Sequence, residues 1–218
     1  MENKSIILLS GGLDSLAGLA HCKDSFQLAL TFDYGQKACK KEIEASKKIC
    51  EFYSVEHKVI KLDWLKNITK TALVSSDDVP LDNFYTQESA KKVWVPNRNG
   101  LFLNIAACFA DSFGFESIII GANAEEAETF PDNSLNFINS AENCFKFSTQ
   151  KQPKIIAPLI GMDKNKIVAH AIKLNAPLEL VISCYQDSEG NCGLCESCLR
   201  LKNALKNNKA DYFIKKLF

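Results

Sequence analysis

The chain has 218 residues, 46% of them hydrophobic and 24% charged, which is the composition of an ordinary globular protein with a core of its own. Lys plus Arg and Asp plus Glu each number 26, so the net charge is zero, whereas proteins built to bind long nucleic acid are basic. No apolar run approaches the roughly 18 residues of a transmembrane helix, and no secretory leader is evident, so we expect a cytoplasmic protein that binds neither nucleic acid nor membrane.

Short apolar segments alternate with amphipathic segments from the first residues onward. We predict strands at 6–9, 26–32, 59–62, 117–120 and 155–157, and helices at 13–22, 40–52, 101–113, 133–149 and 164–174. This alternation is typical of a Rossmann-like α/β fold, a parallel sheet with helices on both faces. The unbroken apolar run at 6–9 indicates a strand that is buried on both sides.

Two segments depart from the alternation. Residues 75–96 hold prolines and aromatics without periodicity, which predicts a loop long enough to act as a lid or binding segment. The tail carries a cysteine cluster followed by a basic helix. We therefore predict one α/β domain at 1–180 and a metal-binding loop with a C-terminal helix at 181–218, packed on the same domain.

The segment Ser10-Gly11-Gly12-Leu13-Asp14-Ser15 joins the first strand to the first helix. Adjacent glycines let the backbone turn sharply and approach a ligand, and the free N–H groups of a helix start attract anions. The string is neither a Walker loop nor a dinucleotide fingerprint. Asp14 either caps the helix or holds a cation such as Mg²⁺ beside phosphates. A tight strand-to-helix turn without a ligand is the alternative.

This hexapeptide resembles the pyrophosphatase loop of the ATP-pyrophosphatase (PP-loop) superfamily, whose members split ATP between its α- and β-phosphates and transfer AMP to an acceptor oxygen. The resemblance implies an adenine nucleotide alpha hydrolase-like fold and ATP bound with Mg²⁺. In open parallel sheets a ligand lies at the carboxyl ends of the strands, near the reversal of strand order. Residues 33–36 and 121–123 follow two strands and are either simple turns or further walls of one nucleotide pocket.

Cys184, Cys192, Cys195 and Cys198 have the spacing C-x7-C-x2-C-x2-C. Two intervening residues let paired sulfurs reach one tetrahedral ion, and four thiolates leave no open coordination position. We therefore predict one structural Zn²⁺ per chain, with an iron–sulfur or redox role as the alternative. The other five cysteines are expected to be small buried hydrophobes.

Further strings resemble one family of this superfamily, the 7-cyano-7-deazaguanine synthases of queuosine precursor biosynthesis. They occur in family order over most of the chain: FDYGQ at 32–36, VPNRN at 95–99, GAN at 121–123, FPDN at 130–133, MDKNKIV at 162–168, SCY at 183–185 and CGLCESC at 192–198. The chain departs from the family pattern at residues 37–38, where Arg-His is usual, and at 133–134, where Cys-Arg is usual. Another cation must then replace the missing arginine.

The family resemblance implies an ATP-dependent ligase and homodimer that converts 7-carboxy-7-deazaguanine and ammonium to 7-cyano-7-deazaguanine through an adenylylated carboxylate and an amide. The resemblance implies cofactor binding by Ser10, Gly11, Gly12, Leu13, Asp14, Ser15, Asp33 and Gly121, and substrate binding by Tyr34, Gln36, Arg98, Asn99, Phe130 and Asp132. The predicted catalytic residues are Asp14, Lys164 and Arg98. Such chemistry depends on placement and charge stabilisation more than on a strong base.

Two rival interpretations remain at this point. Another member of the superfamily would adenylylate a tRNA base for thiolation, with cysteines as sulfur carriers. The second rival comes from a different class of protein, a non-catalytic, zinc-stabilised nucleotide-binding module. The neutral net charge weighs against the first rival, and turnover of ATP with a carboxylate would exclude the second.

Overall fold

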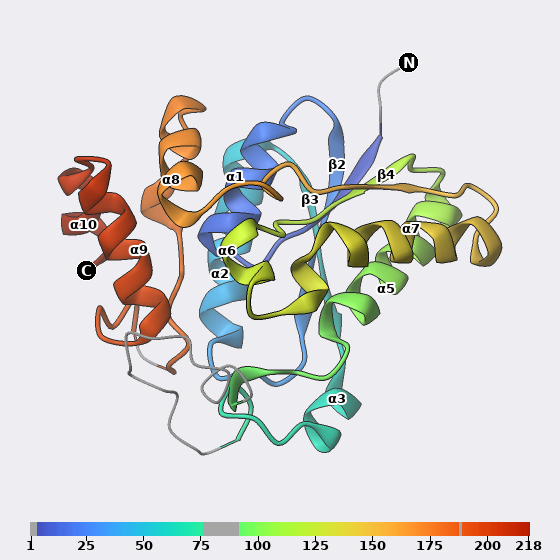
Figure 1. The fold of residues 1–218 in the computed structure, drawn as a ribbon, viewed down its shortest axis with the longest axis horizontal. Helices are drawn as coiled ribbons and strands as arrows, with labels where there is room; N and C mark the ends of the chain where they lie inside the picture. Colours follow the sequence, from blue (N-terminus) through green and yellow to red (C-terminus); the bar gives the residue numbers. More distant parts are fainter. Residues whose placement is uncertain (1–3, 76–91, 188) are drawn as a thin grey trace.

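The structure is a computed structural model that describes residues 4–75, 92–187 and 189–218. Its five-stranded sheet is parallel throughout, with the order β3-β2-β1-β4-β5 (Figure 1). The strands are β1 (Ser5–Leu8), β2 (Phe26–Asp33), β3 (Glu56–Lys61), β4 (Ser117–Ile119) and β5 (Lys154–Ile156). The chain adds β2 and β3 on one side of β1, and then β4 and β5 on the other. Strand order therefore reverses between β1 and β4, where such folds bind ligands.

Helices cover both faces of the sheet, which confirms the predicted fold class. One face carries α1 (Leu13–His21), α2 (Cys39–Tyr53), α8 (Lys164–Lys173), α9 (Glu196–Asn207) and α10 (Asp211–Leu217). The other carries α3 (Asp63–Ile68), α5 (Arg98–Phe113) and α7 (Leu135–Ser148). Short helices α6 (Ala124–Ala127), η1 (Pro131–Asn133) and η2 (Leu178–Leu180) lie in the connections.

The central strand explains why two hydrophobic cores form. Successive side chains of a strand point to opposite faces. Ile7 of β1 therefore packs with α1 and α8, while Ile6 and Leu8 pack with α5 and α7. Both isoleucines are completely buried. The apolar run of β1 thus stabilises both layers at once, as a two-sided strand requires.

Several element boundaries differ from the sequence prediction. Strand β3 begins at Glu56, three residues before the predicted strand. It lies at the sheet edge, and its charged residues Glu56, Lys58 and Lys61 hide the apolar pattern. Helix α5 begins at Arg98, and Asn97 in the left-handed region precedes it. The basic tail forms two helices, α9 and α10. Most of the predicted 75–96 loop lies outside the described residues.

Helix α9 shares the core of the first layer. Leu201 and Leu205 of α9 pack in the same buried cluster as Ile167 of α8. The separation of a 181–218 segment from the domain at 1–180 stays a prediction. Within the described residues, no helix is both long and apolar enough to cross a membrane.

Leu103 offers a test of the second layer, because its side chain is fully buried between α5 and the sheet. Leu103→Ala is expected to lower the free energy of unfolding by about 2 to 5 kcal/mol, measured by urea denaturation. Phe147→Ala is the matched control, since Phe147 is 93% exposed and its loss is expected to cost less than about 0.5 kcal/mol. Equal losses in the two variants would contradict the assigned packing.

Candidate nucleotide and metal sites

The predicted phosphate loop follows β1 and is held by tight backbone packing. Gly11 has a φ of +75°, and a Cβ placed on it would lie 2.8 Å from the Cβ of Ala45 in α2. Gly12 is the N-cap residue of α1, and no side chain caps this helix. The hydroxyl of Ser15 donates to the carbonyl oxygen of Gly12 at 3.1 Å and accepts from the backbone N–H of Ser10 at 3.2 Å. Hydrogen bonds between Ser15 and the backbone of the loop therefore stabilise the loop's conformation.

The end of β4 closes on the same loop. A Cβ on Gly121 would lie 2.8 Å from the carbonyl carbon of Asp14 and 2.9 Å from the nitrogen of Ser15. Only glycine allows this approach without displacing the backbone. Gly121, which follows β4, thus packs against the start of α1 and forms part of the wall of the site.

Asp14 does not cap α1 but faces a lysine of α8. The Lys164 ammonium lies 2.5 Å from Oδ2 of Asp14 and 3.0 Å from Oε1 of Glu126. The three side chains are only 14%, 21% and 24% exposed for Lys164, Asp14 and Glu126 respectively. One lysine therefore compensates two poorly solvated carboxylates.

The pKa values of the two carboxyl groups shift in opposite directions. Burial raises the pKa of Asp14, and Lys164 opposes this effect only in part. Burial would also raise the pKa of Glu126, but Lys164 and Arg200 together lower it below its ordinary value. Oδ1 of Asp14 is buried and accepts no hydrogen bond within the described part of the chain. A free carboxylate oxygen in this position fits the oxygen ligands that Mg²⁺ prefers.

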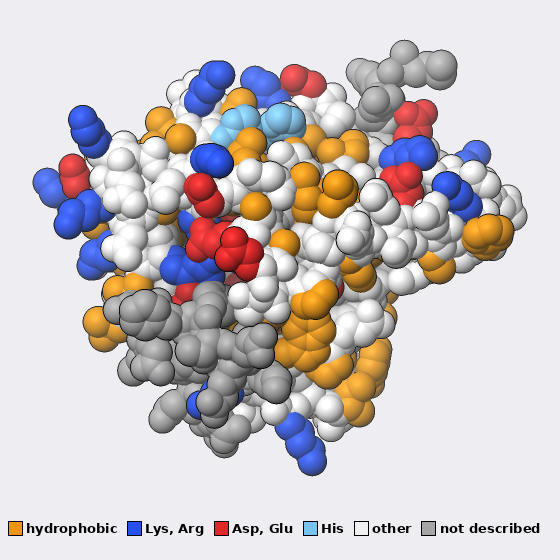
Figure 2. All heavy atoms as spheres, viewed as in Figure 1, with side chains coloured by type: hydrophobic (Ala, Val, Ile, Leu, Met, Phe, Trp, Pro, Cys, Tyr) orange, Lys and Arg blue, Asp and Glu red, His pale blue; other side chains and the backbone are white. Residues whose placement is uncertain are grey.

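A second layer of ion pairs connects this group to the tail. Glu125 accepts the backbone N–H of Lys164 at 2.9 Å and pairs with Arg200 of α9. Arg200 also pairs with Glu196 at 3.2 Å. In the space-filling view, carboxylates gather over α6 with basic side chains beside them (Figure 2). The network joins α6, α8 and α9 at one edge of the candidate site.

These elements surround a cavity of about 230 Å³ at the carboxyl end of the sheet. Predicted site residues on its wall are Ser10, Gly12, Leu13, Asp14, Ser15, Tyr34, Gln36, Arg98, Asn99, Gly121 and Lys164. Phe32 and Phe102 stack with ring centroids 3.9 Å apart on one side. A guanidinium nitrogen of Arg98 lies 3.4 Å from the hydroxyl of Tyr34. The cavity therefore combines the predicted phosphate loop, two cationic side chains and an aromatic wall.

The remaining predicted residues lie elsewhere. Phe130 and Asp132 line a smaller adjoining cavity of about 50 Å³, which Arg98 also lines. Gly11 faces α2 rather than the cavity. Asp33 is on neither wall, and its carboxylate accepts the backbone N–H of Gly35 at 3.1 Å. Asp33 thus stabilises the turn after β2.

The structure adds wall residues that the sequence analysis did not select. They are Glu42 of α2, Glu126 of α6, and Ser183, Tyr185 and Ser197 beside the cysteines. The acidic run around Glu126 was a usable signal, because it follows β4 directly. Glu42 gave no such signal, since it lies in a helix with many charged residues.

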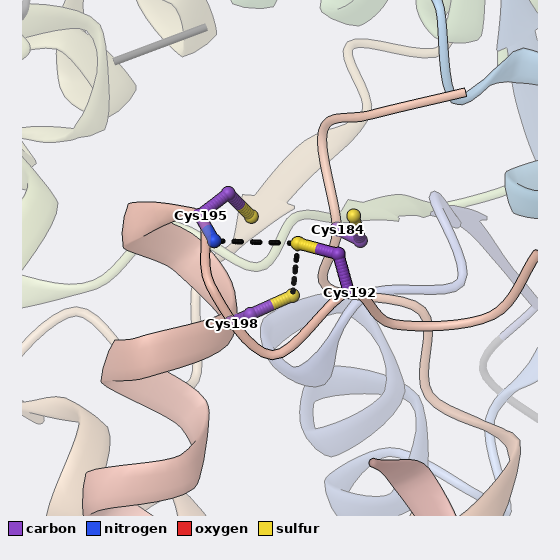
Figure 3. A group of neighbouring side chains, drawn as sticks. All are labelled: Cys184, Cys192, Cys195 and Cys198. Atoms are coloured by element: carbon purple, nitrogen blue, oxygen red, sulfur yellow. Dashed lines mark hydrogen bonds between the residues drawn. The ribbon is translucent and has the colours of Figure 1, made fainter. Parts of the chain in front are cut away.

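The four predicted metal ligands come together (Figure 3). Cys184 and Cys192 lie in loops, Cys195 is the N-cap residue of α9 and Cys198 lies in its first turn. All four sulfurs lie within 4.8 Å of one another, and those of Cys192 and Cys198 are 3.9 Å apart. A tetrahedral ion about 2.3 Å from each thiolate places neighbouring sulfurs about 3.8 Å apart. The group therefore fits one metal ion.

Backbone N–H groups support these sulfurs, as is common around thiolate ligands. The N–H groups of Leu194 and Cys195 donate to the sulfur of Cys192 at 3.4 and 3.3 Å. Among the other five cysteines, Cys108 and Cys144 are exposed. The expectation that all five are buried was wrong, because one face of an amphipathic helix stays in solvent.

The metal segment is also a wall of the cavity. The backbone N–H of Ile182 donates to the carbonyl oxygen of Gly11 at 2.9 Å, which ties this segment to the phosphate loop. Oδ1 of Asn191 accepts the N–H groups of Ser183 and Cys184 at 2.8 and 3.1 Å. Hydrogen bonds therefore connect the cysteine segment to the predicted phosphate loop.

The fold and the two sites define a Rossmann-like α/β protein with a candidate nucleotide cavity and a four-cysteine candidate metal centre. A family model described as queuosine biosynthesis protein QueC matches residues 4–209, and the chain belongs to this family.

Relatives named 7-cyano-7-deazaguanine synthase match over nearly the whole chain. The protein of Methanosarcina barkeri is 51% identical, and that of Methanosarcina mazei 50%, each over 94% of both chains. The protein of Carboxydothermus hydrogenoformans is 48% identical over 94% of this chain and 99% of its own. Among solved structures, the U34-tRNA thiolase NcsA from Methanococcus maripaludis is 17% identical with a TM-score of 0.49, covering 98% of this chain and 69% of that one.

Lys164→Met tests the ion network. It leaves Asp14 and Glu126 buried without their cation, so the free energy of unfolding is expected to fall by about 3 kcal/mol at pH 7. Burial already holds the folded-state pKa of Asp14 above its ordinary value, and loss of Lys164 removes the main group that opposes this shift. The deficit is therefore expected to shrink as the pH is lowered toward 5, because protonation removes the unpaired charges.

The control is Lys166→Met, in the same helix, where the side chain is 67% exposed and its partner is Asp163. Its effect on the free energy of unfolding is expected to stay below about 0.5 kcal/mol at both pH values. A Lys164→Met deficit that does not change between pH 7 and pH 5 would contradict the assigned charge compensation.

Proposed function

We propose that the chain is an ATP-dependent ligase that converts 7-carboxy-7-deazaguanine and ammonium to 7-cyano-7-deazaguanine. The names of its relatives support the product. The observation that carries the ATP dependence is the glycine-rich loop at the strand-order reversal, which opens with Lys164 and Arg98 onto one cavity. Anions bind at such helix starts because free backbone N–H groups and the helix dipole face them.

Activation of the acid is the first chemical requirement. A carboxylate is a poor electrophile, because its departing oxygen leaves badly. In the proposed step a carboxylate oxygen attacks the α-phosphorus of ATP, the bond to the β-phosphate oxygen breaks, and pyrophosphate leaves. Ammonia then attacks the acyl carbon, and AMP departs with the former carboxylate oxygen. The product of this half is the amide.

A nitrile requires the loss of the second oxygen as well. In the proposed second half, the amide oxygen attacks the α-phosphorus of another ATP and pyrophosphate leaves again. The adenylylated intermediate then expels AMP as the nitrogen gives up its remaining protons, and the carbon–nitrogen triple bond forms. The same phosphate loop serves both halves, because both transfer AMP to an oxygen on the same carbon.

Charge stabilisation is the proposed role of the cavity residues. Lys164 and Arg98 face the charge that develops on the transferring phosphate, and Arg98 can also pair with the substrate carboxylate. The free oxygen of Asp14 would hold Mg²⁺, which supplies charge neutralisation at the phosphates. Phe102 and Tyr34 offer aromatic surfaces for a purine-type ring.

Zinc is the proposed metal of the cysteine centre. The fit rests on the chemistry of the donors and on their spacing, since a single tetrahedral ion brings four thiolates this close together. An iron–sulfur cluster spreads its thiolates over several irons and holds them farther apart. With four thiolates the ion has no open position, so its role is to hold the wall segment around Ser183 in place.

The reaction is tested by mixing the protein with 7-carboxy-7-deazaguanine, ATP, Mg²⁺ and ammonium, and following the products by mass spectrometry. Amide and then nitrile are expected, together with AMP and pyrophosphate. ADP with phosphate, or adenylylation of a tRNA base instead, would contradict the proposal. Arg98→Met is expected to lower kcat/KM by about 100-fold, as the loss of a charge-stabilising group does, while Lys166→Met leaves it unchanged.

Metal analysis tests the cysteine centre separately. One zinc per chain is expected in the purified protein, and none in Cys198→Ser, whereas Cys108→Ser, an exposed cysteine in α5, keeps its zinc. Loss of the ion is expected to weaken ATP binding as well, because the segment next to the cysteines is hydrogen-bonded to the phosphate loop through Ile182 and Gly11. Visible absorbance from iron and sulfide in the native protein would contradict the assignment.

A further inference from the structure

Glu42 is a carboxylate in the wall of the large cavity that the proposed reaction does not use. It lies in the first turn of α2, and its backbone carbonyl packs against Gly11 of the phosphate loop. Its side chain faces the same space as Arg98 and Gln36. Burial raises the pKa of Glu42, while Gln36 and Arg98 oppose this effect. Burial of the Glu42 carboxylate therefore costs free energy, and this cost indicates a functional role for the group.

Gln36 fixes one oxygen of this carboxylate. Its amide nitrogen donates to Oε2 of Glu42 at 2.8 Å and to the carbonyl oxygen of Phe32 at 2.9 Å. Its amide oxygen accepts the backbone N–H of Tyr34 at 3.0 Å. All three groups therefore hold Gln36 in one orientation. Within the described residues, the other oxygen of Glu42 accepts no hydrogen bond, so it is available to a ligand in the cavity.

The chemistry of that ligand follows from the acceptor. A carboxylate repels phosphates and other carboxylates, so it does not bind the anionic parts of either substrate, and it attracts N–H donors. The neighbouring wall is aromatic, with Phe32 stacked on Phe102 and the ring of Tyr34 beside them. A flat ring that carries an exocyclic amino group satisfies both features.

We propose that Glu42 accepts a hydrogen bond from the exocyclic amino group of a purine-type ring and thereby selects amino-bearing rings in this cavity. The inference rests on the proposed function, which supplies two such rings, the adenine of ATP and the 7-deazaguanine of the acid. Either ring could use the second carboxylate oxygen of Glu42, which accepts no hydrogen bond within the described residues, and the aromatic wall. The experiment distinguishes them.

The experiment measures equilibrium binding by calorimetry, without turnover. ATP is compared with purine riboside triphosphate, which lacks the 6-amino group, and 7-carboxy-7-deazaguanine with its analogue that lacks the 2-amino group. The wild-type protein is expected to prefer the amino-bearing member of one pair by about 10- to 100-fold, the usual worth of a hydrogen bond to a charged group. The pair that shows the preference identifies the ring.

Glu42→Gln is the test variant. Gln36 donates to its single oxygen, so the new amide nitrogen points a donor at the amino group, and the preference is expected to fall to about twofold or less. Glu44→Gln is the matched control, because Glu44 lies on the exposed face of the same helix and pairs with Lys48. It is expected to keep the wild-type preference. Circular dichroism and urea unfolding confirm that both variants fold.

An unchanged preference in Glu42→Gln for both pairs would overturn the proposal. So would a variant whose only defect is a raised KM for ammonium, since Glu42 would then bind the nitrogen donor instead. Because binding is measured without turnover, the two proposals fail separately. If the wild-type protein forms no nitrile but Glu42→Gln abolishes its preference for amino-bearing rings, the recognition proposal stands and the proposed reaction is wrong.

Discussion

The close approach of three backbone segments at the carboxyl end of β1 is the constraint on which the site depends. Gly11 packs against Ala45 of α2, and Gly121 packs against Asp14 at the start of α1. Side chains at either glycine would push these segments apart. The position of Gly11 is limited by the Cβ of Ala45 and the carbonyl oxygen of Glu42, and that of Gly121 by the backbone of Asp14 and Ser15 in the first turn of α1. The proposed phosphate site is therefore built on close packing that only glycine allows at these two positions.

Charge compensation builds on that frame. Lys164 comes from a helix 150 residues farther along the chain and meets Asp14 and Glu126 in a poorly solvated position. Buried ions are costly unless each has a partner, so the three groups hold their helices in one arrangement. Arg200 extends this dependence to α9 and so to the cysteines. Arg200 therefore links the candidate metal centre to the candidate nucleotide site, and the hydrogen bond between Ile182 and Gly11 is a second link.

Much of the fold could be predicted from the sequence because its signals are local. Apolar runs such as 6–9 and 117–120 identify buried strands wherever they lie, and the helices between them require parallel crossovers. The prediction was weakest at the edges. Strand β3 carries several charged residues, since an edge strand is partly solvated. The start of α5 follows Asn97, which has a left-handed conformation. Neither is visible as hydrophobic periodicity.

The sequence by itself identified the four cysteines that come together and a candidate phosphate loop, because each is a short string whose chemistry requires those residue types at that spacing. Only the tertiary structure decided which distant side chains join them. The sequence indicates a solvated residue of a charged helix at Glu42, and only the structure shows Gln36 and Arg98 beside it. The sequence left Asp14 as either a helix cap or a cation ligand, and only the structure places Lys164 of α8 beside it. Pairings of this kind depend on how helices pack across a sheet, and no local pattern along the chain encodes that distance.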